Sequence, residues 1–423
     1  QAAVIAPAIQ PGRRELVETH VQDLCAGVMR SCPSALCLLL TSGSQRGSSA
    51  SLSCPKHASL WGLARCSRVE QHASTSRLAC ADLGDVGTDW VRVVRLTSTS
   101  REAEVTFRNG APARCLRLAP SKRAHATTTG EACATTHMLG GASSALGELT
   151  ARWLAGSKAA RALVSWSCTA PRLGPIEAML GSMCSVHRAR ASQLIDVGWL
   201  AAASQCHLAP LGGLWLLSDA AVHPLLDGGA RARAQGLRRH FEAELLAAWH
   251  AHSTTQAHPL HMLAAHSPVT ALLGATGQQY DGCAGAGLGS TAAWRRSRGR
   301  RGLALQWGPW GETASTARAS PNAEQPTAVG RGPMAPTHGG AAMEHALNPC
   351  APVGVVVLPT RGRYLQACAQ LQLEGLVQRP QPQGARPLQA CSCRPRPVAA
   401  TTAAPSLMMT PVSAAASSGC GIS

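Results

Sequence analysis

The stretch HMLGGASSALGELTARWLAG, residues 137–156, has the pattern of a strand, a turn of small residues and a helix. Small residues in such a turn let backbone N–H groups approach a pyrophosphate, which then lies at the positive end of the helix. The positions of this predicted phosphate-binding turn are Gly140, Gly141, Ser143, Ser144, Leu146 and Gly147. An ordinary turn of small residues is the alternative, because Ser144 stands at the middle position of a G-x-x-G-x-x-G spacing and its Cβ narrows the approach of a phosphate.

Strand-like and helix-like segments alternate on both sides of this stretch, over residues 134–310. The strand-like runs are ALVSW (162–166), SQLID (192–196), GGLWLLS (212–218), HMLAA (261–265) and GLALQWGPW (302–310), and FEAELLAAWHAH (241–252) has a helical pattern. This alternation is typical of βαβ units, so we expect an α/β fold with a parallel sheet.

Residues 1–120 have the pattern of a smaller α/β unit. Its predicted elements are an apolar start (2–9), a helix (15–29), a strand (35–43), a helix (59–71), a buried strand (78–85) and two β-rich arms (104–118). The arms flank Asn109-Gly110, a pair that favours a tight hairpin because both central residues of a type I′ turn need positive φ.

The chain changes character near residue 376, where Pro, Ala and Ser dominate and periodicity ends. Such a composition buries too little apolar surface to fold alone, so we interpret residues 371–423 as a disordered linker. The expected organisation is a first subdomain over 1–120, a second over 121–370, and this linker. Because the chain begins with Gln rather than Met, we also expect it to be part of a longer protein.

The net charge is +17, yet the distribution of the 39 basic residues argues against nucleic acid as a partner. The arginines are scattered, with one dense run at WRRSRGRR, residues 294–301. A solvated helix end or a phosphate-facing patch explains that run without nucleic acid.

Cysteine and apolar patterns indicate an intracellular protein outside the membrane. The 17 cysteines include no C-x-x-C pair, which favours reduced thiols over a disulfide framework. No apolar run approaches the roughly 20 residues that a bilayer requires, so we expect a soluble, cytoplasmic chain. Five histidines fall between His250 and His266, but they lack Cys pairs or an H-x-x-x-H spacing, and we predict no metal site.

Five blocks of sequence together resemble the ketoreductase domain of modular polyketide synthases and animal-type fatty acid synthases, in the short-chain dehydrogenase superfamily. The similarity covers about residues 1–370. The blocks are SLWGLARCSRVE, REAEVTFRNGAPARCLRL, HMLGGASSALGELTARWLAG, HSPVTALLGATGQQYDGCAGAG and WRRSRGRRGLALQWGPWGE. The resemblance implies two Rossmann-like subdomains with parallel sheets, of which the first is a truncated, non-catalytic copy and the second binds NADPH.

The resemblance also implies catalytic residues. In this family a Tyr protonates a carbonyl oxygen while NADPH delivers hydride, and a Ser thirteen residues earlier hydrogen-bonds the same oxygen. Tyr280 and Ser267 match these two positions. Asp196, followed by Val197, matches the Asp that faces the adenine. A Tyr packed against a helix with its hydroxyl satisfied is the plain structural alternative.

The sequence departs from the family at several positions. Glu244 occupies the place of the Lys that lowers the pKa of the phenol, and Ala284 that of the Asn in the proton relay. Replacing a cation by a potential anion reverses the sign of the perturbation at the phenol. Cys168 aligns with the Arg that commonly receives the 2′-phosphate. The Leu-Asp-Asp signature of one stereochemical class aligns with residues 221–223, so stereochemistry is not predicted.

Two functional interpretations follow. In the first, the chain reduces a β-ketoacyl thioester, delivered by an acyl carrier protein, to a β-hydroxyacyl thioester with NADPH, from a partly degenerate site among neighbouring synthase domains. In the second, it is a catalytically inactive scaffold within a megasynthase.

Overall fold

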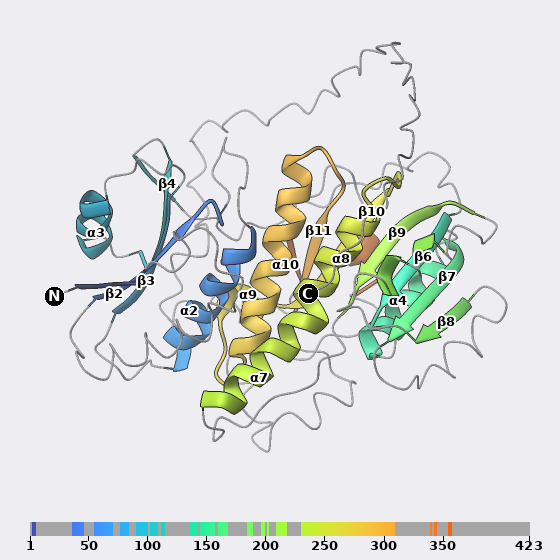
Figure 1. Cartoon of the computed structure of the whole chain (residues 1–423), viewed down its shortest axis with the longest axis horizontal. Helices are drawn as coiled ribbons and strands as arrows, with labels where there is room; N and C mark the ends of the chain where they lie inside the picture. The colour runs from blue at the N-terminus through green and yellow to red at the C-terminus, as the bar shows by residue number, and fades with distance from the viewer. Residues whose placement is uncertain are drawn as a thin grey trace, which may run out of the picture. The chain divides into compact units, whose positions relative to one another are not determined.

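The structure is a computed structural model (Figure 1). The part of the chain that it describes contains two β-sheets. The described residues are 2–5, 36–45, 55–70, 77–83, 90–99, 102–108, 111–114, 135–141, 144–156, 160–167, 184–188, 196–198, 201–202, 209–217, 230–308, 339–340, 342–344 and 354–357. They all belong to one compact unit, residues 1–378. The expected helix over 15–29, Cys168, residues 221–223 and the expected linker over 371–423 lie outside the described residues.

The first sheet follows the order of the chain. Its strands are β1 (Ala2–Ile5), β2 (Leu36–Ser42), β3 (Arg77–Leu83), β4 (Glu104–Arg108) and β5 (Ala111–Arg114). Neighbouring strands are parallel except β4 and β5, which are antiparallel with Arg108 opposite Ala111. This pairing confirms the predicted hairpin, although Asn109 and Gly110 themselves are not described. The strand order does not reverse anywhere in the sheet.

Helices pack on both faces of the first sheet. On one face, Leu38, Ala79 and Phe107 form a core cluster with Val93 of α3 (Trp90–Thr99). On the other, Cys37 and other buried residues face α2 (Ser59–Glu70), which follows the short 3-10 helix η2 (Pro55–Ala58). Alternating side chains of each strand thus supply two separate cores, as the period of two requires.

The second sheet has the strand order β12-β11-β10-β9-β6-β7-β8, with every pair parallel. Its strands are β6 (Thr135–Gly140), β7 (Ala160–Ser167), β8 (Cys184–Arg188), β9 (Leu211–Leu216), β10 (Met262–Pro268), β11 (Leu303–Trp307) and β12 (Gly354–Val357). The chain builds outward from β6 to β8 and then returns to β9 on the other side of β6. Such a reversal opens a crevice at the carboxyl ends of the strands, where doubly wound sheets bind nucleotides. The predicted parallel α/β sheet is confirmed.

The second sheet is also covered on both faces. Leu139, Trp215 and Leu305 form one core with Leu154 of α4 (Ala145–Gly156). The other face meets α7 (Ala230–Phe241), the π-helix η4 (Glu242–Leu246), α8 (Ala247–Thr254) and α10 (Gln279–Ser297). A short helix, α9 (Thr270–Leu273), precedes α10.

The helical run over 230–254 is longer than the sequence predicts. It begins eleven residues before the expected start at Phe241, in the segment ARARAQGLRRHF. Ala, Arg, Gln and Leu are good helix formers, but this segment lacks the apolar period that reveals a helix in sequence. The strand β8 was likewise not predicted.

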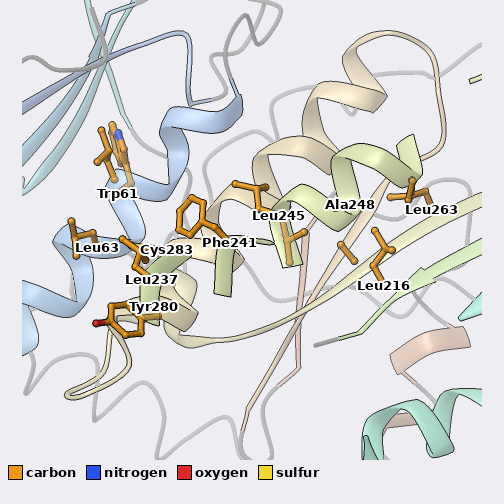
Figure 2. Close-up of a cluster of buried hydrophobic side chains, with 14 of the residues drawn as sticks. Trp61, Leu63, Leu216, Leu237, Phe241, Leu245, Ala248, Leu263, Tyr280 and Cys283 are labelled. Atoms are coloured by element: carbon orange, nitrogen blue, oxygen red, sulfur yellow. The ribbon is translucent and has the colours of Figure 1, made fainter. Parts of the chain in front are cut away.

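Helix α10 packs directly against α2, and glycines make this possible. A Cβ added to Gly62 of α2 would overlap the carbonyl group of Gly282, and one added to Gly285 would lie 2.8 Å from Ala271 Cβ. A Cβ on Gly287 would lie 2.9 Å from Leu245 Cδ2. Gly285 and Gly287, within the sequence GAGLG of residues 285–289, therefore serve helix packing. Figure 2 shows Trp61 and Leu63 of α2 in the same buried cluster as Cys283 of α10.

Two expectations about the chain as a whole can be compared with the described residues. Four of the cysteines, Cys37, Cys66, Cys80 and Cys283, are buried free thiols. Burial raises the pKa of both Cys66 and Cys80 to about 12, so these thiols are protonated at neutral pH. None of the helices within the described ranges combines the length and apolar character needed to span a membrane.

Candidate active site

Ser267 lies near the carboxyl end of β10, on the face of the sheet that α10 covers. It is 4% exposed, and its Oγ has no hydrogen-bond partner among the described residues. A Cβ added to Gly285 would lie 3.4 Å from this oxygen, so the missing side chain at Gly285 leaves room for the hydroxyl. The hydroxyl of Thr270, three residues further along and at the start of α9, is likewise buried without a partner in the described structure.

Tyr280 lies in the first turn of α10 and is 9% exposed. Its ring packs in the core cluster with Leu237 and Cys283, and Figure 2 shows its hydroxyl directed away from the other labelled side chains. The ring of His240 lies against it, with 5.9 Å between the ring centroids. Ser267 thus lies beside Gly285 of α10, the same helix that carries Tyr280 in its first turn. No hydrogen bond joins the hydroxyl of Ser267 to that of Tyr280.

Helix α2, which packs on the first sheet, holds the segment that connects Ser267 to Tyr280. Arg65 Nη1 donates a hydrogen bond of 2.8 Å to the carbonyl oxygen of Ala271. Glu70 Oε1 accepts one of 2.8 Å from the N–H of Gly277, and its Oε2 accepts from the side chain of Gln279. These contacts fix both ends of the α9–α10 connection.

Arg65 is itself anchored by a buried carboxylate. Its Nε and Nη2 donate to Glu104 of β4 at 2.8 and 2.7 Å, and Arg68 also donates to this carboxylate. Burial raises the pKa of Glu104, but Arg65 and Arg68 outweigh that effect and lower it to about 2. Glu104 is therefore ionised at neutral pH, and the ion pair links the first sheet to the segment between Ser267 and Tyr280.

Glu244, which the resemblance places where ketoreductases have Lys, is buried in η4 with an exposure of 6%. It lies close to His240 of α7 and Asp281 of α10. His240 Nε2 donates a hydrogen bond of 2.8 Å to Asp281 Oδ1. Burial lowers the pKa of His240, but this hydrogen bond and the negative charges of Glu244 and Asp281 raise it overall. Ala284 is fully buried and carries no polar side-chain atom.

Sequence reasoning missed His240 and Asp281. The spacing of four residues between His240 and Glu244 places both on one face of a helix and was a usable signal. Asp281 adjoins Tyr280 in sequence, but only the approach of α10 to α7 shows that it meets His240.

The predicted phosphate-binding turn lies at the carboxyl end of β6, beside the reversal of strand order. Gly140 ends the strand and Gly141 has a φ of 74°, a conformation that glycine adopts without strain. Ser144 caps α4: its Oγ donates to Gly141 O at 2.9 Å and accepts from the N–H of Gly147 at 3.0 Å. Leu146 packs at the edge of the core, and Ser143 lies outside the described residues.

This turn fits a phosphate group. The described part of it combines a left-handed glycine, Gly141, with the N-terminus of α4, and both features favour an anion. The cap uses one of the N–H groups of the first turn, so fewer donors face the turn than in a helix that has no capping side chain. The residues of the turn could hold the pyrophosphate of a dinucleotide.

Asp196 and Val197 lie in a short helical segment, residues 196–198. Val197 is 1% exposed and belongs to the core cluster, while Asp196 is half-buried. A Cβ on the next residue, Gly198, would lie 3.6 Å from Thr254 at the end of α8. The role of Asp196 toward adenine stays a prediction.

The histidines between 250 and 266 are used separately. His252 Nδ1 accepts from Arg295, and His266 Nδ1 accepts from Trp307 Nε1 at 2.9 Å. Burial lowers the pKa of His266 to about 3; burial and Arg295 lower that of His252 to about 4. Arg295 lies at the end of α10, so part of the basic run at 294–301 is structural. Of the two explanations given for that run, a solvated helix end does not hold for this arginine, which is 2% exposed.

Comparisons with known proteins concern the fold of the chain. The family model described as KR domain matches residues 135–312. No curated protein sequence matches the chain. A structure described as an A1-type ketoreductase is 23% identical with a TM-score of 0.70, over 82% of this chain and 74% of the other.

Two further structures show the same fold. A-type ketoreductases from a modular polyketide synthase are 24% identical with a TM-score of 0.69, over 81% of this chain and 72% of the other. The first ketoreductase of the tylosin polyketide synthase is 20% identical with a TM-score of 0.69, over 88% and 80%. Residues 135–312 therefore match the KR domain model, and the chain has the fold of these ketoreductase structures.

Proposed function

We propose that this chain is a ketoreductase domain that reduces a β-ketoacyl thioester to a β-hydroxyacyl thioester with NADPH. The observation that carries the proposal is the buried Ser267 hydroxyl, which has no partner among the described residues. A buried polar group left without a hydrogen bond costs roughly 1–3 kcal/mol. An acyl carbonyl oxygen bound at the carboxyl end of β10 would accept that hydrogen bond and remove the cost.

In this proposal Tyr280 donates its phenolic proton to the same carbonyl oxygen. Bound NADPH supplies the hydride. The turn from Gly140 to Gly147 holds the pyrophosphate at the N-terminus of α4, next to the strand-order reversal. Helix α2 positions the two hydroxyls, because it fixes the segment between them through Arg65 and Glu70.

The proposed site works slowly, because its phenol lacks a lysine. An unperturbed tyrosine has a pKa near 10 and is a weak acid at neutral pH. A nearby cation lowers that value, whereas the buried carboxyl of Glu244 does not. The substrates arrive on an acyl carrier protein, from neighbouring synthase domains.

An inactive scaffold within a megasynthase is the second candidate. The burial of the Tyr280 ring in the core and the alanine at position 284 favour it. Such a domain would keep the fold and space its neighbours without binding the nucleotide.

NADPH binding and turnover separate the two candidates. The purified chain is titrated with NADPH by nicotinamide fluorescence and then given a short β-ketoacyl thioester while nicotinamide absorbance is followed. We expect saturable binding and slow oxidation that Tyr280→Phe and Ser267→Ala abolish. Tyr364→Phe, which removes the other tyrosine of the chain, is the matched control and keeps the activity.

The converse experiment restores the family residues. Glu244→Lys combined with Ala284→Asn is expected to raise turnover strongly. A chain that shows no fluorescence change at high NADPH, with or without these substitutions, is the scaffold.

A further inference from the structure

Three side chains whose atoms commonly ligate metal ions meet between α7, η4 and α10. They are His240, Glu244 and Asp281, and one ligand atom of each lies within 4.8 Å of the other two. His240 and Glu244 are four residues apart on one helical run, so both face α10. The trio is independent of the phosphate-binding turn and of Ser267.

The trio is largely buried. His240 is 1% and Glu244 6% exposed, and the side chain of Asp281 is 15% exposed. An imidazole and two carboxyl groups in one buried place are the ligand types that transition-metal ions take in proteins.

Backbone packing keeps the ligand atoms close together. A Cβ on Gly287 would lie 2.9 Å from Leu245, so the glycine lets α10 approach η4 next to Glu244. The π-helical turn of η4 carries Glu244 itself, and such turns are frequent at functional sites. Asp281 lies at the start of α10, where its partial exposure leaves a path to solvent.

We propose that His240, Glu244 and Asp281 bind one divalent transition-metal ion. One imidazole nitrogen and two carboxylate oxygens suit Zn²⁺ or Mn²⁺, and three protein ligands leave a coordination position for water. To bind the ion, the hydrogen bond between His240 and Asp281 is exchanged for two metal–ligand bonds. The bound ion joins the α7–η4 run to α10, and it places a positive charge near Tyr280, whose ring adjoins His240.

Co²⁺ is the probe that tests the site. It replaces Zn²⁺ in nitrogen and oxygen sites, and its visible spectrum distinguishes these ligands from thiolates, which matters in a chain with 17 cysteines. The full chain is treated with a chelator, desalted and titrated with Co²⁺ at neutral pH. We expect binding of one ion with a spectrum free of thiolate charge transfer, and displacement by Zn²⁺.

Isosteric variants assign the ligands. His240→Gln and Glu244→Gln are each expected to weaken Co²⁺ binding by more than the roughly 10–100-fold that loss of an outer-shell partner costs. His261→Gln and Glu148→Gln, at an exposed histidine and a partly exposed glutamate on other elements, serve as matched controls and keep the affinity. Circular dichroism checks that each variant is folded. If a core variant unfolds, Asp281→Asn, at the most exposed of the three, must show the same loss.

Three results would overturn the proposal: no stoichiometric Co²⁺ binding, unchanged affinity in the folded ligand variants, or a thiolate spectrum. Because the readout is metal binding alone, it is independent of NADPH binding and of reduction. A chain that binds Co²⁺ but reduces nothing would sink the proposed function and leave the metal site standing.

Discussion

Arg65 of α2 donates a hydrogen bond of 2.8 Å to the carbonyl oxygen of Ala271, three residues after the end of β10. The two residues are 206 positions apart in sequence. Arg65 is held in turn by Glu104 of the first sheet. The first sheet therefore helps to position the segment between Ser267 and Tyr280. A helix outside the nucleotide-binding sheet therefore acts on the proposed active site.

Replacing Arg65 is expected to destabilise the fold substantially. Arg65→Met leaves the buried Glu104 with Arg68 alone, and breaking a buried ion pair costs roughly 3–5 kcal/mol, of which we expect the lower end. Urea unfolding measures the change. Arg152→Met breaks the exposed pair with Glu148 and should cost no more than about 0.5 kcal/mol. Equal losses of stability in the two variants would show that the buried pair with Glu104 stabilises the fold no more than the exposed pair with Glu148 does.

Adding one methyl group at the helix contact should have opposite effects at two glycines. In Gly62→Ala the new Cβ overlaps the backbone of Gly282, and such overpacking costs roughly 1–3 kcal/mol. In Gly289→Ala the new Cβ meets nothing within 4 Å, so the gain in helix propensity should stabilise the chain by about 0.5–1 kcal/mol. Thermal unfolding of both variants compares the signs. A stabilising Gly62→Ala would refute the close approach of α2 and α10.

Substitutions of Ser144 should separate stability from nucleotide affinity. Ser144→Ala removes the cap of α4 and is expected to cost about 1 kcal/mol, whereas Ser144→Gly should cost only a few tenths. Both variants free the N–H of Gly147, and glycine also removes the Cβ that narrows the turn. We expect Ser144→Gly to bind NADPH more tightly than the unmodified chain in a fluorescence titration. Weaker binding would mean that the serine hydroxyl itself contacts the phosphate.

Acid should destabilise the fold through His266. Its pKa in the folded chain is about 3, below the usual 6.5, so the unfolded chain binds more protons between these values. Stability is therefore complete above about 6.5 and falls with decreasing pH by up to about 1.4 kcal/mol per unit. His266→Gln keeps an acceptor for Trp307 but does not titrate, so its stability should depend less on pH.

The measurement is urea unfolding at several pH values from neutral down to about 5, the acidic limit of maximal stability in many proteins. Glu104 begins to lose its stabilising charge only below 4.5, the ordinary pKa of that carboxyl, so its titration stays outside this range. His252 also titrates there, but equally in both proteins. Identical pH slopes for the two proteins would mean that His266 is protonated in the folded state.

The sequence by itself determined the elements and their class. Short apolar runs predicted the strands β2, β6, β9 and β11, and Asn109-Gly110 predicted the hairpin of β4 and β5. Both signals can be recognised in sequence because they depend only on residues that are neighbours in the chain. The resemblance to the ketoreductase family named Ser267 and Tyr280, thirteen residues apart, as the proposed catalytic pair. Ser267 packs against α10 and Tyr280 lies in it. The catalytic roles of the two residues remain predictions, which the substitutions above test.

Only the tertiary structure decided what surrounds that pair. The sequence showed an alanine-rich helical stretch with Glu244 in it, but it did not show that His240 and Asp281 join this carboxylate. It also gave no sign that Arg65 and Glu70 hold the segment before Tyr280. These contacts join residues that are far apart in the chain. They depend on the close approach of helix backbones at Gly62, Gly282 and Gly287. The packing of helices on both sheets determines how close that approach is. Local periodicity carries no information about such distances.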